Sequence, residues 1–409
     1  MITPNKSLLK FITAGSVDDG KSTLIGRLLY DSKSVFSDQL ETLTNNTSND
    51  SFDQQLNLAL LTDGLRSERE QGITIDVAYR YFSTPNRKFI IGDTPGHIQY
   101  TRNMVTAASN ADAALVIIDA RNGITEQALR HSYLCSLLGL KHIVYCINKM
   151  DLVNYDSLTY FSIVKDLAKI SQKLSCSRSF IPISALTGEG VVNISRRMPW
   201  YRGHTLIEML NELDIESTRN RAKRISIQLV SDDFIAGKVL AGSLAINERV
   251  TLYPSGDSAK ITELRTSKGL VNSVHEGESC SLKLSGPSIL NRGVLIAGKD
   301  HQPRVSCEIN AVTCWLSDDN LKHHQNYILR LAAFETVCSI RKVVNLIDIT
   351  SFESICPEDQ TLKLNDIASV IIQVSNPVSF DNYKTCKSTG SFILIDLSSG
   401  ATVGAGIIN

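Results

Sequence analysis

The sequence lacks long apolar runs and an excess of charge of either sign. No uninterrupted apolar stretch could span a bilayer, because even residues 113–118 have only the length of a strand. Lys plus Arg and Asp plus Glu number 42 each, so the formal net charge is +0 and no overall field attracts nucleic acid or an anionic membrane. We therefore expect a soluble protein that binds neither nucleic acid nor membrane.

Paired cysteines and an export signal are also missing. The nine cysteines occur singly, without a CxxC pair and without a histidine at metal-ligand spacing. The first ten residues contain no charged segment followed by an apolar run and a cleavage site. These observations predict reduced thiols and a cytoplasmic protein.

The 409 residues are too many for one ordinary core, so we expect two or three domains. Up to about residue 214, short apolar runs alternate with helix-length amphipathic segments, which is typical of a parallel sheet covered by helices. After residue 217 many short strands follow without helical periodicity, which favours β-barrels. We predict an α/β P-loop GTPase domain followed by two β-barrel domains, with boundaries at 1–215, 216–300 and 301–409.

A phosphate-binding loop follows the first predicted strand. It matches G-x-x-x-x-G-K-[ST] and leads into a helix at Thr23, and its residues are Gly15, Ser16, Val17, Asp18, Asp19, Gly20, Lys21 and Ser22. Its glycines let backbone N–H groups curl around phosphates, and a catalytic Lys21 reaches the β and γ oxygens. The Ser22 hydroxyl is a candidate Mg²⁺ ligand.

Two switch segments are predicted downstream. Asp93 follows a strand, where the second Mg²⁺ contact of such enzymes sits, and Gly96 lets its backbone approach the γ-phosphate. His97 is a candidate for orienting the attacking water, although a solvated loop histidine is the alternative. The earlier segment 68–76 contains Thr74, which we expect to offer its hydroxyl to Mg²⁺ and to the γ-phosphate in catalysis.

The guanine-reading loop is predicted at Asn148, Lys149 and Asp151. The Asp151 carboxylate can accept hydrogen bonds from N1–H and the exocyclic amine of guanine, whereas adenine would leave it unpaired. GTP is therefore favoured over ATP. A second loop suits a backbone N–H onto guanine O6, with Lys149 over the base, and its residues are Ser184, Ala185 and Leu186.

Other polar features have a simpler interpretation. His131, His142 and His204 show no partner in the sequence, so we expect structural roles for them. The charge run 219–224 reads as a solvated linker after the GTPase domain.

The chain resembles the large, GTP-binding subunit of bacterial sulfate adenylyltransferase, also called ATP sulfurylase subunit 1. The resemblance rests on 15–29 in the phosphate loop and helix, on 61–65, on 99–104 and on His131, Ser132 and Tyr133. Translation factors such as elongation factor Tu are similar in the switches but typically have His where this chain has Asp19. The resemblance implies two β-barrels, a cytoplasmic GTPase, and a heterodimer with a small subunit that makes adenosine 5′-phosphosulfate and pyrophosphate from ATP and sulfate.

The resemblance also suggests a division of labour. No HxGH nucleotidyl-transfer motif occurs here, so we expect adenylyl transfer in the small subunit, with GTP hydrolysis coupled to that uphill step. Relatives with a fused adenylylsulfate kinase have a second phosphate loop, which this chain lacks, so we expect no kinase activity. The alternatives are a translation-factor-like GTPase and a GTP-binding regulatory subunit of another pathway.

Overall fold

The computed structural model describes residues 7–33, 76–214, 222–231, 234–286, 290–322, 325–357 and 359–409. It divides into two compact units, one of Met1–Ile215 with Ile349–Glu353 and one of Glu216–Asp348 with Ser354–Asn409. The three predicted domain boundaries stay predictions.

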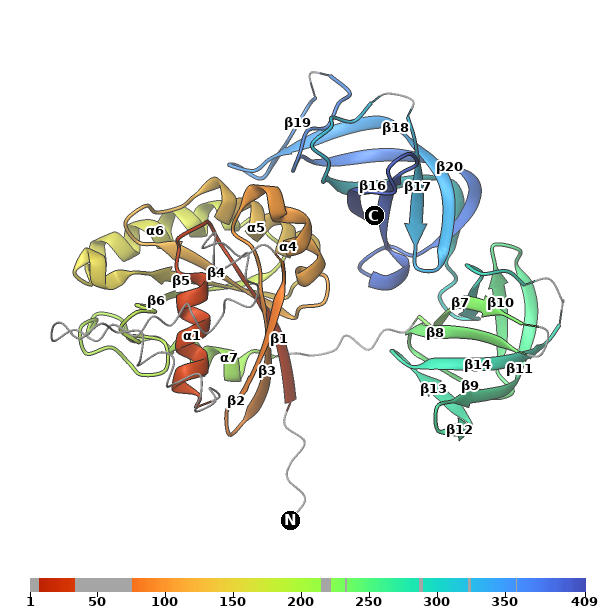
Figure 1. Cartoon of the computed structure of the whole chain (residues 1–409), viewed down its shortest axis with the longest axis horizontal. Coiled ribbons are helices and arrows are strands. Elements are labelled where there is room, and N and C mark those ends of the chain that lie inside the picture. Colours follow the sequence, from red (N-terminus) through yellow and green to blue (C-terminus); the bar gives the residue numbers. More distant parts are fainter. Residues whose placement is uncertain are drawn as a thin grey trace, which may run out of the picture. The chain divides into compact units, whose positions relative to one another are not determined.

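The first unit contains a six-stranded sheet (Figure 1). In spatial order its strands are β2 (Ala78–Ser83), β3 (Arg87–Asp93), β1 (Ser7–Ala14), β4 (Ala113–Asp119), β5 (His142–Asn148) and β6 (Ser177–Pro182). β1, β3, β4, β5 and β6 are parallel, as the apolar runs predict. The sequence did not identify β2, which pairs antiparallel with β3 at the edge.

Helices cover both faces of this sheet. α1 (Lys21–Asp31) and α7 (Leu206–Glu212) bury Leu24, Leu28 and Leu210 in one core with the strands. α4 (Thr101–Ala108) and α5 (Glu126–Leu137) lie together on the other face (Figure 1). α6 (Ser157–Ser171) precedes β6, and short 3-10 turns occur at η2 (Ile98–Tyr100) and η3 (Met150–Val153).

The second unit contains two closed barrels, which confirms the predicted fold class. The first barrel runs in the order β10, β15, β7, β8, β14 and β11, and a β10–β11 pairing closes it. The strands are β7 (Arg224–Val230), β8 (Ile235–Ala241), β10 (Arg249–Tyr253), β11 (Asp257–Thr266), β14 (Ser279–Ser285) and β15 (Leu295–Gly298), with the short β9 (Ser243–Ala245), β12 (Gly269–Leu270) and β13 (Ser273–His275) beside them.

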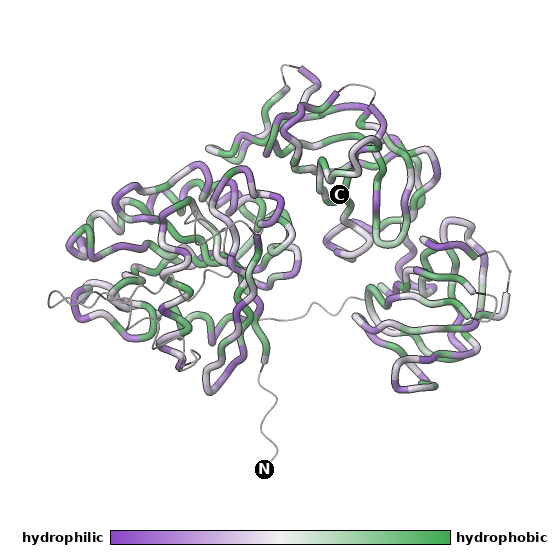
Figure 2. Tube along the Cα trace, in the orientation of Figure 1, coloured by the Kyte–Doolittle hydropathy of each residue, from purple (hydrophilic) through white to green (hydrophobic). Residues whose placement is uncertain are grey.

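The second barrel runs in the order β17, β21, β22, β16, β20 and β18, and a β17–β18 pairing closes it. Its strands are β16 (Arg304–Trp315), β17 (Asn326–Leu331), β18 (Phe334–Asp348), β20 (Ile367–Phe380), β21 (Ser391–Asp396) and β22 (Thr402–Ile408), with β19 (Glu353–Ile355) and the turn η4 (Lys387–Thr389). Hydrophobic stretches follow the strands of the sheets, and hydrophilic stretches gather in the connecting loops (Figure 2).

Arg224 is not the solvated linker residue that the charge run predicted. Its side chain is fully buried and donates from Nε and Nη2 to the two carboxylate oxygens of Asp381, at 2.9 and 2.7 Å. The Thr389 hydroxyl donates to the same carboxylate at 2.6 Å. Arg224 begins β7, so its charge serves a buried ion pair within the second unit.

Candidate nucleotide-binding site

The predicted site residues follow the carboxyl ends of parallel strands. Gly15 follows β1, Thr94 follows β3, Lys149 follows β5 and Ser184 follows β6. Since β1 and β3 pair in parallel with Thr13 opposite Asp93, their loops emerge at one edge of the sheet. The fold thus gathers three sequence motifs that lie more than fifty residues apart.

The phosphate loop has a backbone that only glycine fits. Gly20 lies at φ +94°, and a Cβ there would meet the Asn148 side-chain nitrogen at 2.4 Å. Gly15 lies at φ +139°, and its Cβ would meet the Ile117 carbonyl oxygen at 2.5 Å. The helix α1 begins at Lys21, two residues before the predicted start at Thr23. Its N-terminal N–H groups therefore face the loop, as an anion site requires.

Two buried side chains accept hydrogen bonds from the first backbone N–H groups of this loop. The Ser16 N–H donates to Asp19 Oδ2 at 2.6 Å, and the Gly15 N–H donates to His131 Nδ1 at 3.1 Å. His131 is fully buried on α5, and its Nε2 is 2.8 Å from Gln127 Nε2. Burial, with the charges of Lys21 and Arg130, lowers the pKa of His131 to about 3. The neutral imidazole is therefore the form that accepts the Gly15 amide.

Lys21 lies folded along the loop. Its ammonium donates to the Ser16 carbonyl at 2.5 Å and approaches the Gly15 carbonyl at 3.5 Å. Burial lowers the pKa of Lys21, while the charges of Asp93, Asp19 and Asp18 raise it. These loop carbonyls are weak partners for a buried ammonium compared with phosphate oxygens.

Asp93 is fixed at the end of β3. It is 2% exposed, and its Oδ1 accepts the Thr13 hydroxyl at 3.0 Å. The Thr94 hydroxyl donates to the Thr13 carbonyl at 2.5 Å, which ties the start of the second switch to β1. A carboxylate oriented in this way suits a second contact to a Mg²⁺ ion.

Gly96 lies against the phosphate loop. A Cβ at Gly96 would meet Lys21 Nζ at 2.4 Å and the Ser16 carbonyl carbon at 2.9 Å. The Gly96 backbone thus lies close to the loop that is predicted to bind the phosphates, and its contact with the γ-phosphate stays a prediction. His97 follows in extended backbone and is half-buried, with its ring 6.3 Å from that of Tyr100.

The guanine loop joins the phosphate loop through Asn148. Its Nδ2 donates to the Asp19 carbonyl at 2.8 Å, and its Oδ1 accepts the Ala185 N–H at 2.9 Å. Asp151 Oδ1 is buried and accepts no hydrogen bond from the described residues. A buried acceptor left unpaired costs about 1–3 kcal/mol, so this atom suits an external donor such as guanine N1–H.

The loop after β6 is held by Arg27 of α1. Arg27 Nε donates to the Ala185 carbonyl at 3.1 Å, and its Nη2 donates to the Leu186 carbonyl. Because the Ala185 N–H already bonds Asn148, it holds the two loops together in this structure.

The structure describes two of the three predicted magnesium ligands. Ser22 lies in the first turn of α1 and Asp93 at the end of β3. Thr74 and the whole predicted first switch up to residue 75 lie outside the described residues. One hydroxyl and one carboxylate fit Mg²⁺, which keeps several waters and binds substrate phosphates.

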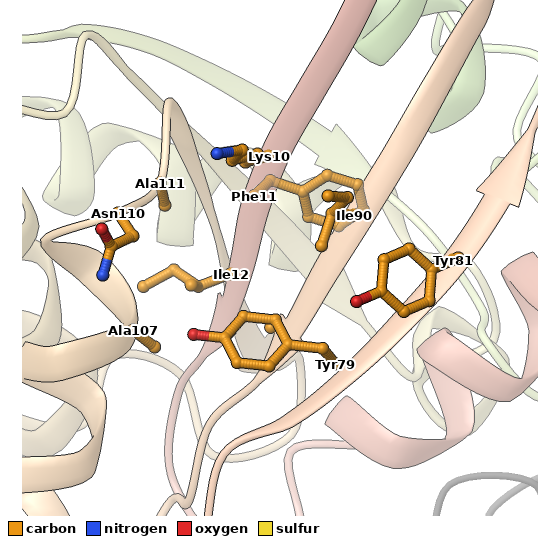
Figure 3. Close-up of a pocket in the computed structure, with 10 residues that line it drawn as sticks. Lys10, Phe11, Ile12, Tyr79, Tyr81, Ile90, Ala107, Asn110 and Ala111 are labelled. Atoms are coloured by element: carbon orange, nitrogen blue, oxygen red, sulfur yellow. The ribbon is translucent and has the colours of Figure 1, made fainter. Parts of the chain in front are cut away.

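A hollow of about 270 Å³ lies elsewhere on the sheet (Figure 3). The rings of Tyr79 and Tyr81 line one side, and Asn110 beyond α4 lies across from them. None of the predicted nucleotide residues lines it, so the candidate site is built by the loops at the strand ends.

Sequence reasoning gave no role to Arg27 or Asp119, and it gave His131 a structural role without its partner Gly15. Asp119 ends β4, is 1% exposed, and pairs with Lys149 at 2.8 Å. One available signal was position, because Asp119 ends a buried strand as Asp93 does. The other was the i, i+4 spacing of Gln127 and His131 on a helix. Neither signal identifies the residue that Asp119 or His131 contacts.

Comparison with known proteins agrees with this geometry. The family described as "Elongation factor Tu GTP binding domain" matches residues 6–216, and "GTP-eEF1A C-terminal domain-like" matches residues 308–409. Among solved structures, the Ski7 GTPase-like domain of S. cerevisiae bound to GTP aligns with a TM-score of 0.54 at 17% identity, over 99% of this chain and 97% of that one. This likeness shows the fold.

Curated relatives match nearly the whole chain. "Sulfate adenylyltransferase subunit 1" of Psychromonas ingrahamii is 43% identical over 99% of this chain and 87% of its own length. The protein of the same name from Francisella tularensis subsp. novicida is 43% identical over 98% of this chain and 87% of its own length. Among the described residues, no helix has the length and apolarity needed to cross a membrane.

Proposed function

The chain belongs to the sulfate adenylyltransferase subunit 1 family, with an elongation factor Tu type GTP-binding domain, and we propose that it is the GTPase subunit of this enzyme. In this role it hydrolyses GTP and drives synthesis of adenosine 5′-phosphosulfate and pyrophosphate from ATP and sulfate in a small catalytic subunit. The observation that carries the proposal is Asp151 Oδ1, which is buried and accepts no hydrogen bond from the part of the chain that the structure describes, in the loop that Asn148 joins to the phosphate loop.

Guanine selection follows from the charge on Asp151. Guanine presents two adjacent donors, N1–H and the exocyclic amine, and a carboxylate can accept both. Adenine presents an unprotonated ring nitrogen at the same place, so its binding would bury the charge without a partner. The side-chain amide of Asn148 is engaged with Asp19 and Ala185, and the Ser184 N–H is engaged with the Glu189 carbonyl. We therefore assign base reading to Asp151 and, within residues 184–186, to the Leu186 N–H.

The phosphates of GTP would bind at the N-terminus of α1. Lys21 exchanges its contacts with loop carbonyls for the β and γ oxygens, and the loop amides from Asp18 to Ser22 supply further donors. Ser22, Asp93 and Thr74 would hold Mg²⁺, which when bound neutralises charge on the β and γ oxygens.

Hydrolysis needs a group that orients water toward the γ-phosphorus. His97 follows Gly96, whose backbone approaches the phosphate loop, so His97 is the residue to which we assign this role. Its half-buried ring is available to accept a proton from water or to hold it by a hydrogen bond.

Coupling of GTP hydrolysis to synthesis of adenosine 5′-phosphosulfate requires a partner subunit. Switch segments that contact the γ-phosphate change conformation on hydrolysis, and a small subunit that binds one state preferentially gains free energy from that change. All nine cysteines are free, six of them in the two barrels and their connections, which suits a reducing cytoplasm.

The experiment is GTP turnover by the purified chain with and without a small subunit of a sulfate adenylyltransferase. Turnover should rise when the small subunit, ATP and sulfate are all present, and stay low when sulfate is omitted. If the chain binds GTP but its turnover is the same in every mixture, it serves another partner. If it binds no guanine nucleotide, the whole assignment fails.

A further inference from the structure

Asp119 lies between the two nucleotide loops and is almost completely buried. It ends β4, the strand between β1, which leads into the phosphate loop, and β5, which leads into the guanine loop. Its register partner on β5 is Asn148, one residue before Lys149. The strand pairing therefore fixes the carboxylate beside the guanine loop.

This carboxylate is held from two sides. Arg121 donates from Nε and Nη2 to the two oxygens at 3.1 and 2.6 Å, and its own side chain is 47% exposed. Lys149 Nζ lies 2.8 Å from Oδ2. Burial alone would raise the pKa of Asp119, but hydrogen bonds from Arg121 and Lys149 hold it far below its ordinary value. The group is thus an anion at any physiological pH.

Lys149 needs such an anchor. Its backbone lies in the left-handed region at φ 61°, which costs about 1 kcal/mol or more for a residue other than glycine and persists only where neighbours impose it. Its side chain has four rotatable bonds and would sample many rotamers if unpaired. The ammonium contacts Asp119 Oδ2 and the Asp18 carbonyl of the phosphate loop.

We propose that Asp119, oriented by Arg121, is a positioning residue for guanine nucleotide: it clamps the Lys149 side chain so that its stem is in place to cover the base. The proposal rests on the proposed GTP site and names a determinant of its affinity. By holding Lys149 before the nucleotide arrives, Asp119 lowers the ordering cost of binding, and the benefit should appear mainly as slower dissociation.

The charges around Asp119 support a role in the site over a role in the core. Hydrogen bonding to Asp119 and its charge raise the pKa of Arg121, and the charge of Asp151 adds to this effect. Asp119 in turn contributes to the raised pKa of Asp19, after burial as the main cause. The charge of Asp119 therefore acts at the phosphate loop, and Arg121 lies within reach of the charges of both Asp119 and Asp151.

The test is the dissociation rate of a fluorescent GDP analogue from the full chain, by stopped flow. Asp119→Asn should raise this rate roughly tenfold or more, the size expected for a lost charge-assisted contact. Arg121→Gln, which changes a side chain that is 47% exposed, should raise it about threefold. Asp166→Asn on α6 is the matched control with the same charge change at an exposed site, and should leave the rate unchanged.

A double-mutant cycle separates positioning from general stability. In a Lys149→Met background, Asp119→Asn should change dissociation less than about twofold, because its partner is already gone. Equal effects in both backgrounds, or wild-type dissociation in both Asp119→Asn and Arg121→Gln, would overturn the proposal. If the wild-type chain itself binds no guanine nucleotide, the proposed GTPase function is wrong. This result differs from one in which the wild-type chain binds the nucleotide and the Asp119 variants do not change its dissociation.

Discussion

At the scale of single residues, the site combines a buried acceptor that no described residue pairs with and an amide that is already engaged. Asp151 Oδ1 is the acceptor, and the Asn148 amide is held by Asp19 and Ala185. In the proposed site the Asp151 carboxylate is the side chain that reads the base, so a change of its hydrogen-bonding character should change which base is bound.

Asp151→Asn should weaken GTP binding by at least about tenfold and favour xanthosine triphosphate. Xanthine has a carbonyl where guanine has its exocyclic amine, and an asparagine NH₂ can donate to that carbonyl. Competition of the two nucleotides against a fluorescent GDP analogue measures the switch. Unchanged preference for GTP in the variant would remove Asp151 from base reading.

His97→Ala should lower the rate constant for GTP hydrolysis by roughly 10²-fold or more and leave GTP affinity within about threefold. The histidine follows Gly96, whose backbone lies against the phosphate loop, whereas the loop glycines and Lys21 are placed to bind the phosphates. Single-turnover hydrolysis and equilibrium binding separate the two effects. Loss of affinity with unchanged hydrolysis of bound GTP would contradict the water-orienting role.

His131 should make stability depend on pH in mildly acidic solution. Its pKa is about 3 in the fold because burial disfavours the imidazolium, and near 6.5 in an unfolded chain. Between pH 3 and pH 6.5 the unfolded chain binds more protons than the folded chain. The free energy of unfolding therefore has its full value above pH 6.5 and falls by up to about 1.4 kcal/mol per pH unit below it. The midpoint of urea unfolding between pH 7 and pH 5 measures this slope.

The control for His131 is His131→Gln, because a glutamine oxygen can still accept the Gly15 N–H and does not titrate. Its stability curve should be flatter than that of the wild-type chain over the same range. Parallel curves for the two proteins would show that His131 does not carry the effect.

At the scale of elements, the second switch and the phosphate loop meet through backbone at Gly96. Gly96→Ala should lower GTP affinity roughly tenfold or more, since the added Cβ would fall 2.4 Å from Lys21 Nζ and 2.9 Å from backbone of Ser16. Gly123→Ala is a control in the same unit: it strains a residue at φ +68° but its Cβ meets nothing within 4 Å. It should lower stability by about 1 kcal/mol without changing affinity.

The elements also show what the sequence could predict. The positions of the phosphate loop, the predicted second switch and the predicted guanine loop after β1, β3 and β5 could be predicted, because each is a contiguous motif that follows an apolar strand. β2 was missed because its exposed Tyr79 and Tyr81 break the apolar pattern of the buried strands. The pairing of Asp119 with Lys149 was also missed, because it depends on β4–β5 register, which no local pattern specifies.

At the scale of the whole molecule, a buried ion pair holds the second unit together. Arg224 and Asp381 lie 157 positions apart, and their side chains are 0% and 5% exposed. Burial of a charge is costly unless it is paired, so each partner depends on the other. Because no local pattern links two residues so far apart in the chain, the sequence predicted Arg224 to be a linker residue.

Asp381→Asn should therefore destabilise the second unit by about 3–5 kcal/mol, because it leaves the Arg224 charge buried and unpaired. Glu335→Gln is the matched control, since it breaks an exposed pair with Arg330 and should cost less than about 1 kcal/mol. Urea unfolding of the two variants measures both. Equal small losses would show that the Arg224 charge finds other partners.

The central claim is that GTP hydrolysis by this chain drives formation of adenosine 5′-phosphosulfate. The most direct measurement is the level of this product that the complex with a small subunit reaches from ATP and sulfate, with GTP and with a non-hydrolysable GTP analogue. Hydrolysable GTP should raise the final level above that reached by ATP and sulfate alone, and the analogue should not. A final level that is the same in all three mixtures would contradict the coupling.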